Sequence, residues 1–88
     1  MITKTQAATP WGRAVLIEEA TLRQQAGELR FASHVQLLEL PGGERLVRFA
    51  YSTDGTARRG PVTLRQRDLE RLRAALGKRP ELAEALGL

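Results

Sequence analysis

The chain has 88 residues, no cysteine, 42% hydrophobic and 27% charged residues, and a formal net charge of +4. This is typical of one small globular domain, and the lack of cysteine excludes a disulfide scaffold, a thiolate zinc site and a cysteine nucleophile. Residues 1–10 are too polar for a signal peptide and no apolar run approaches the roughly 20 residues of a membrane span, so we expect a soluble cytoplasmic protein.

The positive charge is concentrated in the second half of the chain. Residues 44–79 carry ten basic side chains against four acidic ones, and twelve of the fourteen basic residues of the whole chain are arginine. Arginine is suited to bidentate phosphate contacts and to stacking on flat rings, although a GC-rich genome also favours arginine. The asymmetry indicates a polyanion as a candidate partner.

The N-terminal third predicts a lead and a first strand. Residues 1–12 are interpreted as a flexible lead, and residues 13–88 as a single α+β domain. Trp11, in the lead, has two interpretations: packing under the sheet or contact with a partner. The segment 13–24 is β-branched at its start and predicts a strand, with helix as the alternative for its second half because its alternation is imperfect.

A second and a third strand follow in alternating segments. Residues 31–40 place Phe31 and Val35 on one face and His34 on the other. Pro41-Gly42-Gly43 then predicts a turn, and it leads into a strand over residues 45–52.

The dipeptide Asp54-Gly55 predicts a tight hairpin, because both central positions of a type I′ turn need a positive φ. Residues 56–64 are therefore expected to return as a fourth strand. Pro61 lacks an amide hydrogen, which places this strand at a sheet edge or turns the proline outward.

The hydrophobic period then changes to that of a helix. Leu69, Leu72 and Leu76 fall on one face and predict a helix over 66–76. Thr63 with Gln66 fits a capping box at its start, and a start nearer Arg65 fits equally well.

A short terminal helix is predicted over residues 80–86, since Pro80 suits a first helical turn. The expected fold class is α+β, with the helix over 66–76 laid on one face of a four-stranded antiparallel sheet. Its elements are strands at about 13–24, 31–40, 45–52 and 56–64, a helix at 66–76 and a short helix at 80–86.

The sequence does not indicate catalysis. His34 is the only histidine, and Glu18 and Glu19 are adjacent, so in a strand they face opposite ways. Gly42-Gly43 belongs to a turn, and no glycine pattern matches a phosphate-binding or dinucleotide-binding loop. We expect a binding protein with no catalytic residue, no metal and no cofactor.

Arginines and aromatic residues alternate in the predicted hairpin. Unpaired bases are bound by such surfaces, because cations follow the phosphates while flat rings stack on the bases. The alternative is that Phe31, Phe49 and Tyr51 form the core face under the helix. The candidate nucleic-acid contacts are Arg45, Arg48, Tyr51, Arg58, Arg59 and Arg65.

The hairpin and the segment after it contain Phe49-Ala50-Tyr51, the Asp54-Gly55 turn, the basic pair Arg58-Arg59 before Gly60, Thr63-Leu64, and the leucine-striped helix. With these motifs, residues 31–76 resemble the positive-cofactor-four family of transcriptional coactivators. The resemblance implies a curved antiparallel sheet, a helix that dimerises, and binding of single-stranded or melted DNA. RNA is the alternative nucleic acid for a basic surface of this kind. The same six candidate contacts would then touch nucleic acid in a regulator of transcription.

A protein-interaction module or an accessory subunit is the alternative function. A free edge strand accepts a partner strand, and a striped helix pairs with another helix. We expect a homodimer under either function, because the C-terminal leucines exceed what one short sheet can cover. The candidate interface residues are Leu69, Leu72, Leu76, Leu82 and Leu86.

Overall fold

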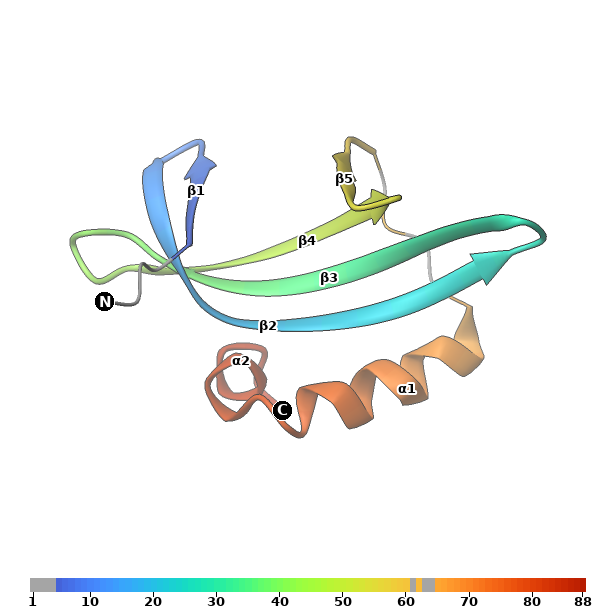
Figure 1. Cartoon of the computed structure of the whole chain (residues 1–88). Helices are drawn as coiled ribbons and strands as arrows, with labels where there is room; N and C mark the ends of the chain where they lie inside the picture. The colour runs from blue at the N-terminus through green and yellow to red at the C-terminus, as the bar shows by residue number, and fades with distance from the viewer. Residues whose placement is uncertain (1–4, 61, 63–64) are drawn as a thin grey trace.

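The structure is a computed structural model and describes residues 5–60, 62 and 65–88. Within these residues a run of strands is followed by two helices (Figure 1). The elements are β1 (Gln6–Thr9), β2 (Gly12–Ala26), β3 (Leu29–Glu39), β4 (Arg45–Thr53), β5 (Thr56–Arg58), α1 (Gln66–Leu76) and α2 (Pro80–Ala85). The predicted α+β class, a sheet followed by C-terminal helices, is confirmed.

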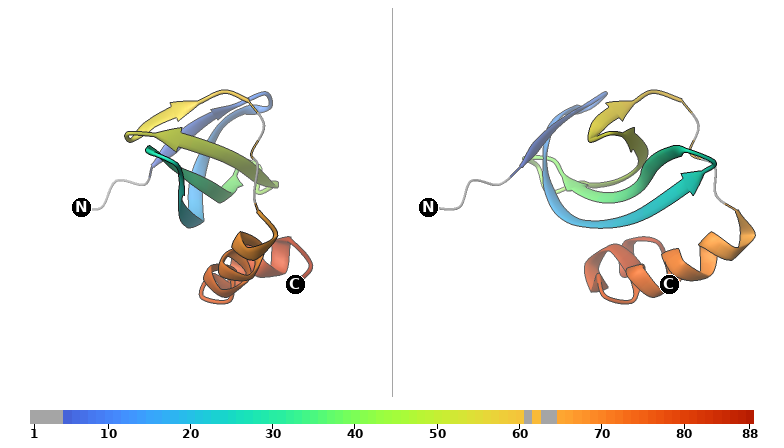
Figure 2. Two further views of the ribbon diagram at one scale, coloured as in Figure 1. Left: turned by 90° about the vertical axis from the view of Figure 1, so that its right-hand side faces the viewer. Right: turned by 45° about the vertical axis from the view of Figure 1, so that its right-hand side comes forward.

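The strands form one antiparallel sheet in sequence order, β1-β2-β3-β4-β5. A two-residue turn joins β2 to β3, because Ala26 pairs with Leu29. The pairing of β2 with β3 shifts between Leu16 and Glu18, and such a bulge bends a strand. The sheet is curled, and β1 and β5 rise from its two ends on the same side (Figures 1 and 2).

Both helices lie against the convex side of this curled sheet (Figure 1). Ala20, Val35 and Leu37 of the sheet form a buried cluster with Leu76 of α1 and Leu82 of α2. Burial of one leucine side chain contributes roughly 1.5–3 kcal/mol, so the helices are held mainly by this cluster. The concave face, which we call the trough, is left uncovered by helices.

The prediction of a flexible lead over residues 1–12 is wrong for Gln6–Thr9, which form β1 and pair with β2. A tight turn makes this pairing possible. Gly12 has a φ of 117°, and the Thr9 hydroxyl accepts from the Trp11 amide at 3.1 Å while donating to the Gly12 carbonyl at 2.6 Å. The sheet therefore has five strands where four were expected.

Two of the predicted strands differ in extent from those observed. β2 is strand from Gly12 to Ala26, which excludes the helical alternative for its second half. The last strand, expected over 56–64, is confirmed only for Thr56–Arg58. The expectations for Pro61 and for a capping box at Thr63 lie outside the described residues.

The helices begin where the sequence indicated. α1 spans the predicted 66–76, with Arg65 as its N-cap, and α2 ends at Ala85, one residue before the predicted end. The expectation that Leu76 and Leu82 face a partner is wrong: they are 5% and 0% exposed within the chain's own core. The reason is that two helices, not one, cover the convex face.

Candidate nucleic-acid interface

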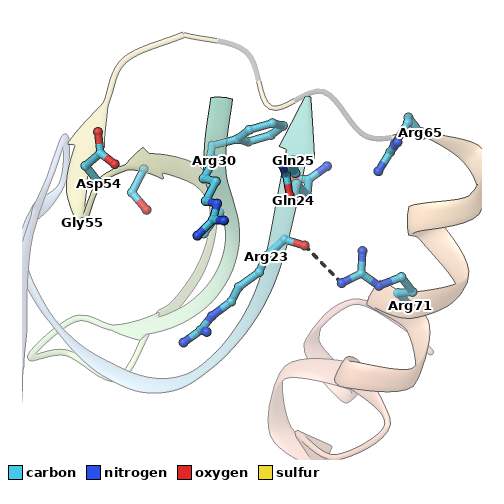
Figure 3. A pocket seen from close by; sticks show the side chains of 11 residues that line it. Arg23, Gln24, Gln25, Arg30, Asp54, Gly55, Arg65 and Arg71 are labelled. Carbon is cyan, nitrogen blue, oxygen red and sulfur yellow. Dashed lines mark hydrogen bonds between the residues drawn. The ribbon is translucent and has the colours of Figure 1, made fainter. Parts of the chain in front are cut away.

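An open recess of about 550 Å³ lies at the end of the sheet where β2 turns into β3. Arg23 of β2 and Arg30 of β3 line it from the trough side, and Arg65 and Arg71 line it from α1 on the other side of β2 (Figure 3). We call these four side chains and the space between them the arginine recess.

The strand register brings the two sheet arginines together. Gln25 pairs with Arg30 and Arg23 pairs with Ala32. Paired residues point to the same face, as do residues two apart in a strand. Arg23 and Arg30 therefore both project from the concave face, close to the turn that joins their strands.

Asp68 positions the two helix arginines. Its carboxylate is 1% exposed and accepts hydrogen bonds from Arg65 at 2.9 Å, Arg71 at 3.2 Å and Gln24 at 3.3 Å. The hydrogen bond from Arg65 is the main cause that lowers the pKa of Asp68 to about 2, with Gln24 and Arg71 adding to it and burial opposing it. The carboxylate therefore stays charged and fixes both guanidinium groups at the edge of β2.

The arginine recess carries an excess of positive charge. Arg65 and Arg71 share the single carboxylate of Asp68, and Arg71 also donates to the Arg23 carbonyl at 3.1 Å, the dashed line in Figure 3. Among the described residues, Arg23 and Arg30 form no ion pair. Asp54 is the carboxylate among the described lining residues, and Asp68 lies buried behind Arg65 and Arg71, so four guanidinium groups have two carboxylates beside them.

Polar side chains continue from the recess along the trough. His34 contacts the hydroxyls of Thr21 at 3.2 Å and Ser52 at 2.9 Å through its two ring nitrogens. One row further, Arg48 donates to Gln36 at 2.8 Å and to the Ala8 carbonyl at 3.2 Å, which ties β4 to β1 across the trough. The trough is thus lined by polar side chains, and the Glu19 carboxylate lies among them, 3.6 Å from the Nδ1 of His34.

The six predicted contacts do not form one surface. Arg45 lies at the far end of β4 from Tyr51, roughly 20 Å away along the strand, and it pairs with Glu39 at 3.1 Å and Glu81 at 3.2 Å. Those two hydrogen bonds raise the pKa of Arg45, and the one to Glu39 has the larger effect. An arginine engaged by two carboxylates is poorly available to a phosphate.

The remaining predicted contacts are divided between the two faces. Arg48 lies in the trough, whereas Arg58, bonded to the Thr53 hydroxyl, lies on the convex side beside Tyr51. Arg59 is exposed and its carbonyl accepts from the Tyr51 hydroxyl at 3.1 Å. Of the six, only Arg65 lines the arginine recess.

The aromatic residues are accessible to different degrees. Phe49 is 55% exposed, so the alternative that it belongs to the core is wrong. Phe31 and Tyr51 are half-buried. The reason is the placement of the helices, which contact β2 and β3 more than β4.

Sequence reasoning missed Arg23, Arg30 and Arg71. A signal for the first two was present: Gly27-Glu28 is a two-residue turn with a positive φ at Gly27, and such a turn fixes the register of its strands. Arg71 gave no comparable signal, because its contact with β2 depends on where α1 crosses the sheet.

Other kinds of site find no support in the described part of the chain. No group of three histidine, aspartate or glutamate side chains there could hold a metal ion, and none of its helices has the length and apolar character to cross a membrane.

A scan against protein-family models and searches of curated proteins and of solved structures each gave no match. The resemblance to the positive-cofactor-four family stays a prediction.

Proposed function

We propose that this protein binds single-stranded nucleic acid, with phosphates held in the arginine recess and the strand continuing along the trough. The observation that carries the proposal is the gathering of Arg23, Arg30, Arg65 and Arg71 from three elements, with two of them free of ion pairs among the described residues. Guanidinium groups fit phosphate oxygens through paired hydrogen bonds.

The surroundings of the recess favour a single strand over other polyanions. Phe31 lines the recess itself, and Tyr51 lies nearby on β4. Binding of unpaired strands combines a positive groove with rings on which bases stack. A polyanion without bases, such as heparin, would use the arginines but not the rings.

Fluorescence anisotropy of a labelled oligothymidylate at low salt tests the proposal. The double variant Arg23→Ala/Arg30→Ala should weaken binding by about tenfold or more, since hydrogen bonds to charged groups contribute roughly 1.5–3 kcal/mol. Both side chains are exposed, so the variant should fold.

The matched control removes the same charge elsewhere. Arg67→Ala/Arg73→Ala changes two exposed arginines of α1 that do not line the recess, and it should bind nearly as well as the wild type. Equal losses in the two variants would mean that only net charge matters and would contradict the assignment of the recess. No binding by the wild type at low salt would overturn the proposed function.

A second candidate function, self-association through β4, is favoured by a different observation. β5 pairs only with Tyr51–Thr53, so within the described residues β4 has no strand partner over 45–50 on that side. Trp11 at 68% and Phe49 at 55% exposure flank a cavity of about 350 Å³ there. Exposed edges with apolar neighbours accept another strand, and a second copy would supply one.

Light scattering on the purified protein at high micromolar concentration tests this homodimer. We expect a dimer mass that falls to a monomer mass in the variant Phe49→Lys, because a charge at that position disfavours edge pairing. A wild-type monomer would contradict self-association, whatever the outcome for nucleic acid.

A further inference from the structure

A second cavity, of about 440 Å³, adjoins the arginine recess on the convex side of the sheet. Leu29, Phe31 and Tyr51 supply its apolar lining, and Ser33 and Thr53 lie among them. Its volume is within the range of small-molecule sites, about 300–1,000 Å³. We call it the aromatic cavity.

The aromatic cavity and the arginine recess share part of their walls. Gln24, Gln25, Phe31 and Arg65 line both. One compartment is therefore cationic and the other is apolar and aromatic, and the two meet at Phe31 and Arg65. A ligand that spans them needs an anionic group joined to a flat, largely apolar ring.

Existing hydrogen bonds hold the walls of the cavity in place. Gln24 is 7% exposed and is bonded to both Asp68 and the Ser33 hydroxyl. The Tyr51 hydroxyl donates to the Arg59 carbonyl at 3.1 Å, which fixes the outer end of its ring. The Tyr51 ring and the Gln24 amide are thus positioned before any ligand arrives, which reduces the entropy lost on binding.

We propose that the aromatic cavity binds the base of one nucleotide whose phosphate lies in the arginine recess. This inference rests on the proposed function and deepens it. Stacking on Phe31 or Tyr51 accepts any base, since every base has a flat face, and the guanidinium of Arg65 at the shared wall can contact either the phosphate or the ring.

The position of the cavity requires the base to leave its neighbours. The trough lies on the concave side, whereas the cavity lies on the convex side next to the N-terminal end of α1. A base of a strand that lies in the trough reaches it around the end of β2 and β3, and a base in a duplex cannot do so without unpairing. The cavity therefore selects for single strands, strand ends, or free nucleotides.

Two probes distinguish a nucleotide within a strand from a free one. The first is an oligothymidylate with a single 2-aminopurine, whose emission is quenched by stacking, placed in turn at each end and in the middle. The second is free 2-aminopurine nucleoside 5′-monophosphate. A dye at a distant position of the oligonucleotide reports strand binding by anisotropy, independently of whether any base stacks.

The variants Phe31→Leu and Tyr51→Leu each remove one ring and keep an apolar side chain. We expect each to lose most of the quenching and to weaken binding of the probe by roughly fivefold to a hundredfold. Phe49→Leu is the matched control, because Phe49 is on the same strand as Tyr51 but does not line the cavity. Thermal melting followed by circular dichroism shows which variants remain folded. If one ring variant does not fold, the other one alone tests the base site.

The outcomes separate the two proposals. Quenching that depends on Phe31 or Tyr51 supports the base site. The probe that responds, oligonucleotide or free nucleotide, shows which ligand supplies the base. Strand binding without quenching, or with quenching lost equally in Phe49→Leu, overturns the base site and leaves the proposed function standing. Quenching of the free nucleotide without strand binding overturns the proposed function alone. Absence of both signals overturns both.

Discussion

Asp68 connects three parts of the molecule through a single carboxylate. Its oxygens accept from Arg65 at the start of α1, from Arg71 nearly two turns later and from Gln24 of β2. The Ser33 hydroxyl extends this network to β3 through Gln24. Because two of the four arginines that line the recess, Arg65 and Arg71, are held by this buried charge, Asp68 serves both the docking of α1 and the shape of the candidate site.

Replacement of this carboxylate should make stability less dependent on pH. The pKa of Asp68 is lowered to about 2 in the folded chain, against about 3.9 for an unfolded aspartate. A depressed pKa gives stability that is present above about pH 4 and is lost as the pH falls towards about 2. Urea denaturation should show Asp68→Asn less stable than the wild type at pH 7, with the difference shrinking below pH 4.

Glu70→Gln is the control for this pH series. It removes one negative charge from the same helix, but Glu70 is exposed and forms no ion pair among the described residues. Its stability should follow that of the wild type across the whole range. A constant gap between Asp68→Asn and the wild type down to pH 2 would show that hydrogen-bond geometry, not charge, is what the carboxylate supplies.

The short helix α2 shows how packing stabilises a segment too short to be a helix alone. It has six residues, and isolated helices shorter than about 12–15 residues are marginal in water. Leu82 is 0% exposed within the core cluster, and its amide donates to the Glu18 carboxylate at 2.8 Å. Tertiary contacts therefore fix the C-terminal end of the fold.

Leu82→Ala should lower the free energy of unfolding by about 2–5 kcal/mol, the usual range for a buried leucine replaced by alanine. Leu88→Ala is the comparison, because Leu88 is 66% exposed and exposed substitutions stay within about 0.5 kcal/mol. Urea denaturation of both variants measures the difference. Similar losses would mean that α2 is not held through Leu82.

Elements whose conformation is set by their own residues were predictable from the sequence. Elements that depend on contacts with residues far along the chain were not. The hairpin at Asp54-Gly55 was confirmed, with φ values of 50° and 77°, because the turn residues themselves demand it. The helix at 66–76 followed from its leucine period. β1 was missed, because the four residues Gln-Ala-Ala-Thr have no strand pattern of their own and become a strand only when β2 lies beside them.

The candidate site of the whole molecule likewise contains residues that the sequence indicated and residues that only the fold brings together. Sequence reasoning found the positive character of the chain and one residue of the recess, Arg65. It did not find Arg23 or Arg30, which belong to a part of the chain with little net charge. Their role arises from the curl of the sheet and the crossing of α1, which bring separate elements to one end of β2.

The salt dependence of binding measures how many phosphates the assembled surface contacts. Each phosphate neutralised on a single strand contributes about −0.7 to the slope of log affinity against log salt, because condensed counterions are released. If Arg23 and Arg30 each contact one phosphate, Arg23→Ala/Arg30→Ala should flatten this slope by about 1.4 between roughly 50 and 200 mM salt. Arg67→Ala/Arg73→Ala should leave the slope unchanged. A weaker affinity with an unaltered slope would instead mean that the two sheet arginines contact bases or other protein groups, and that the phosphates follow a different path across the trough.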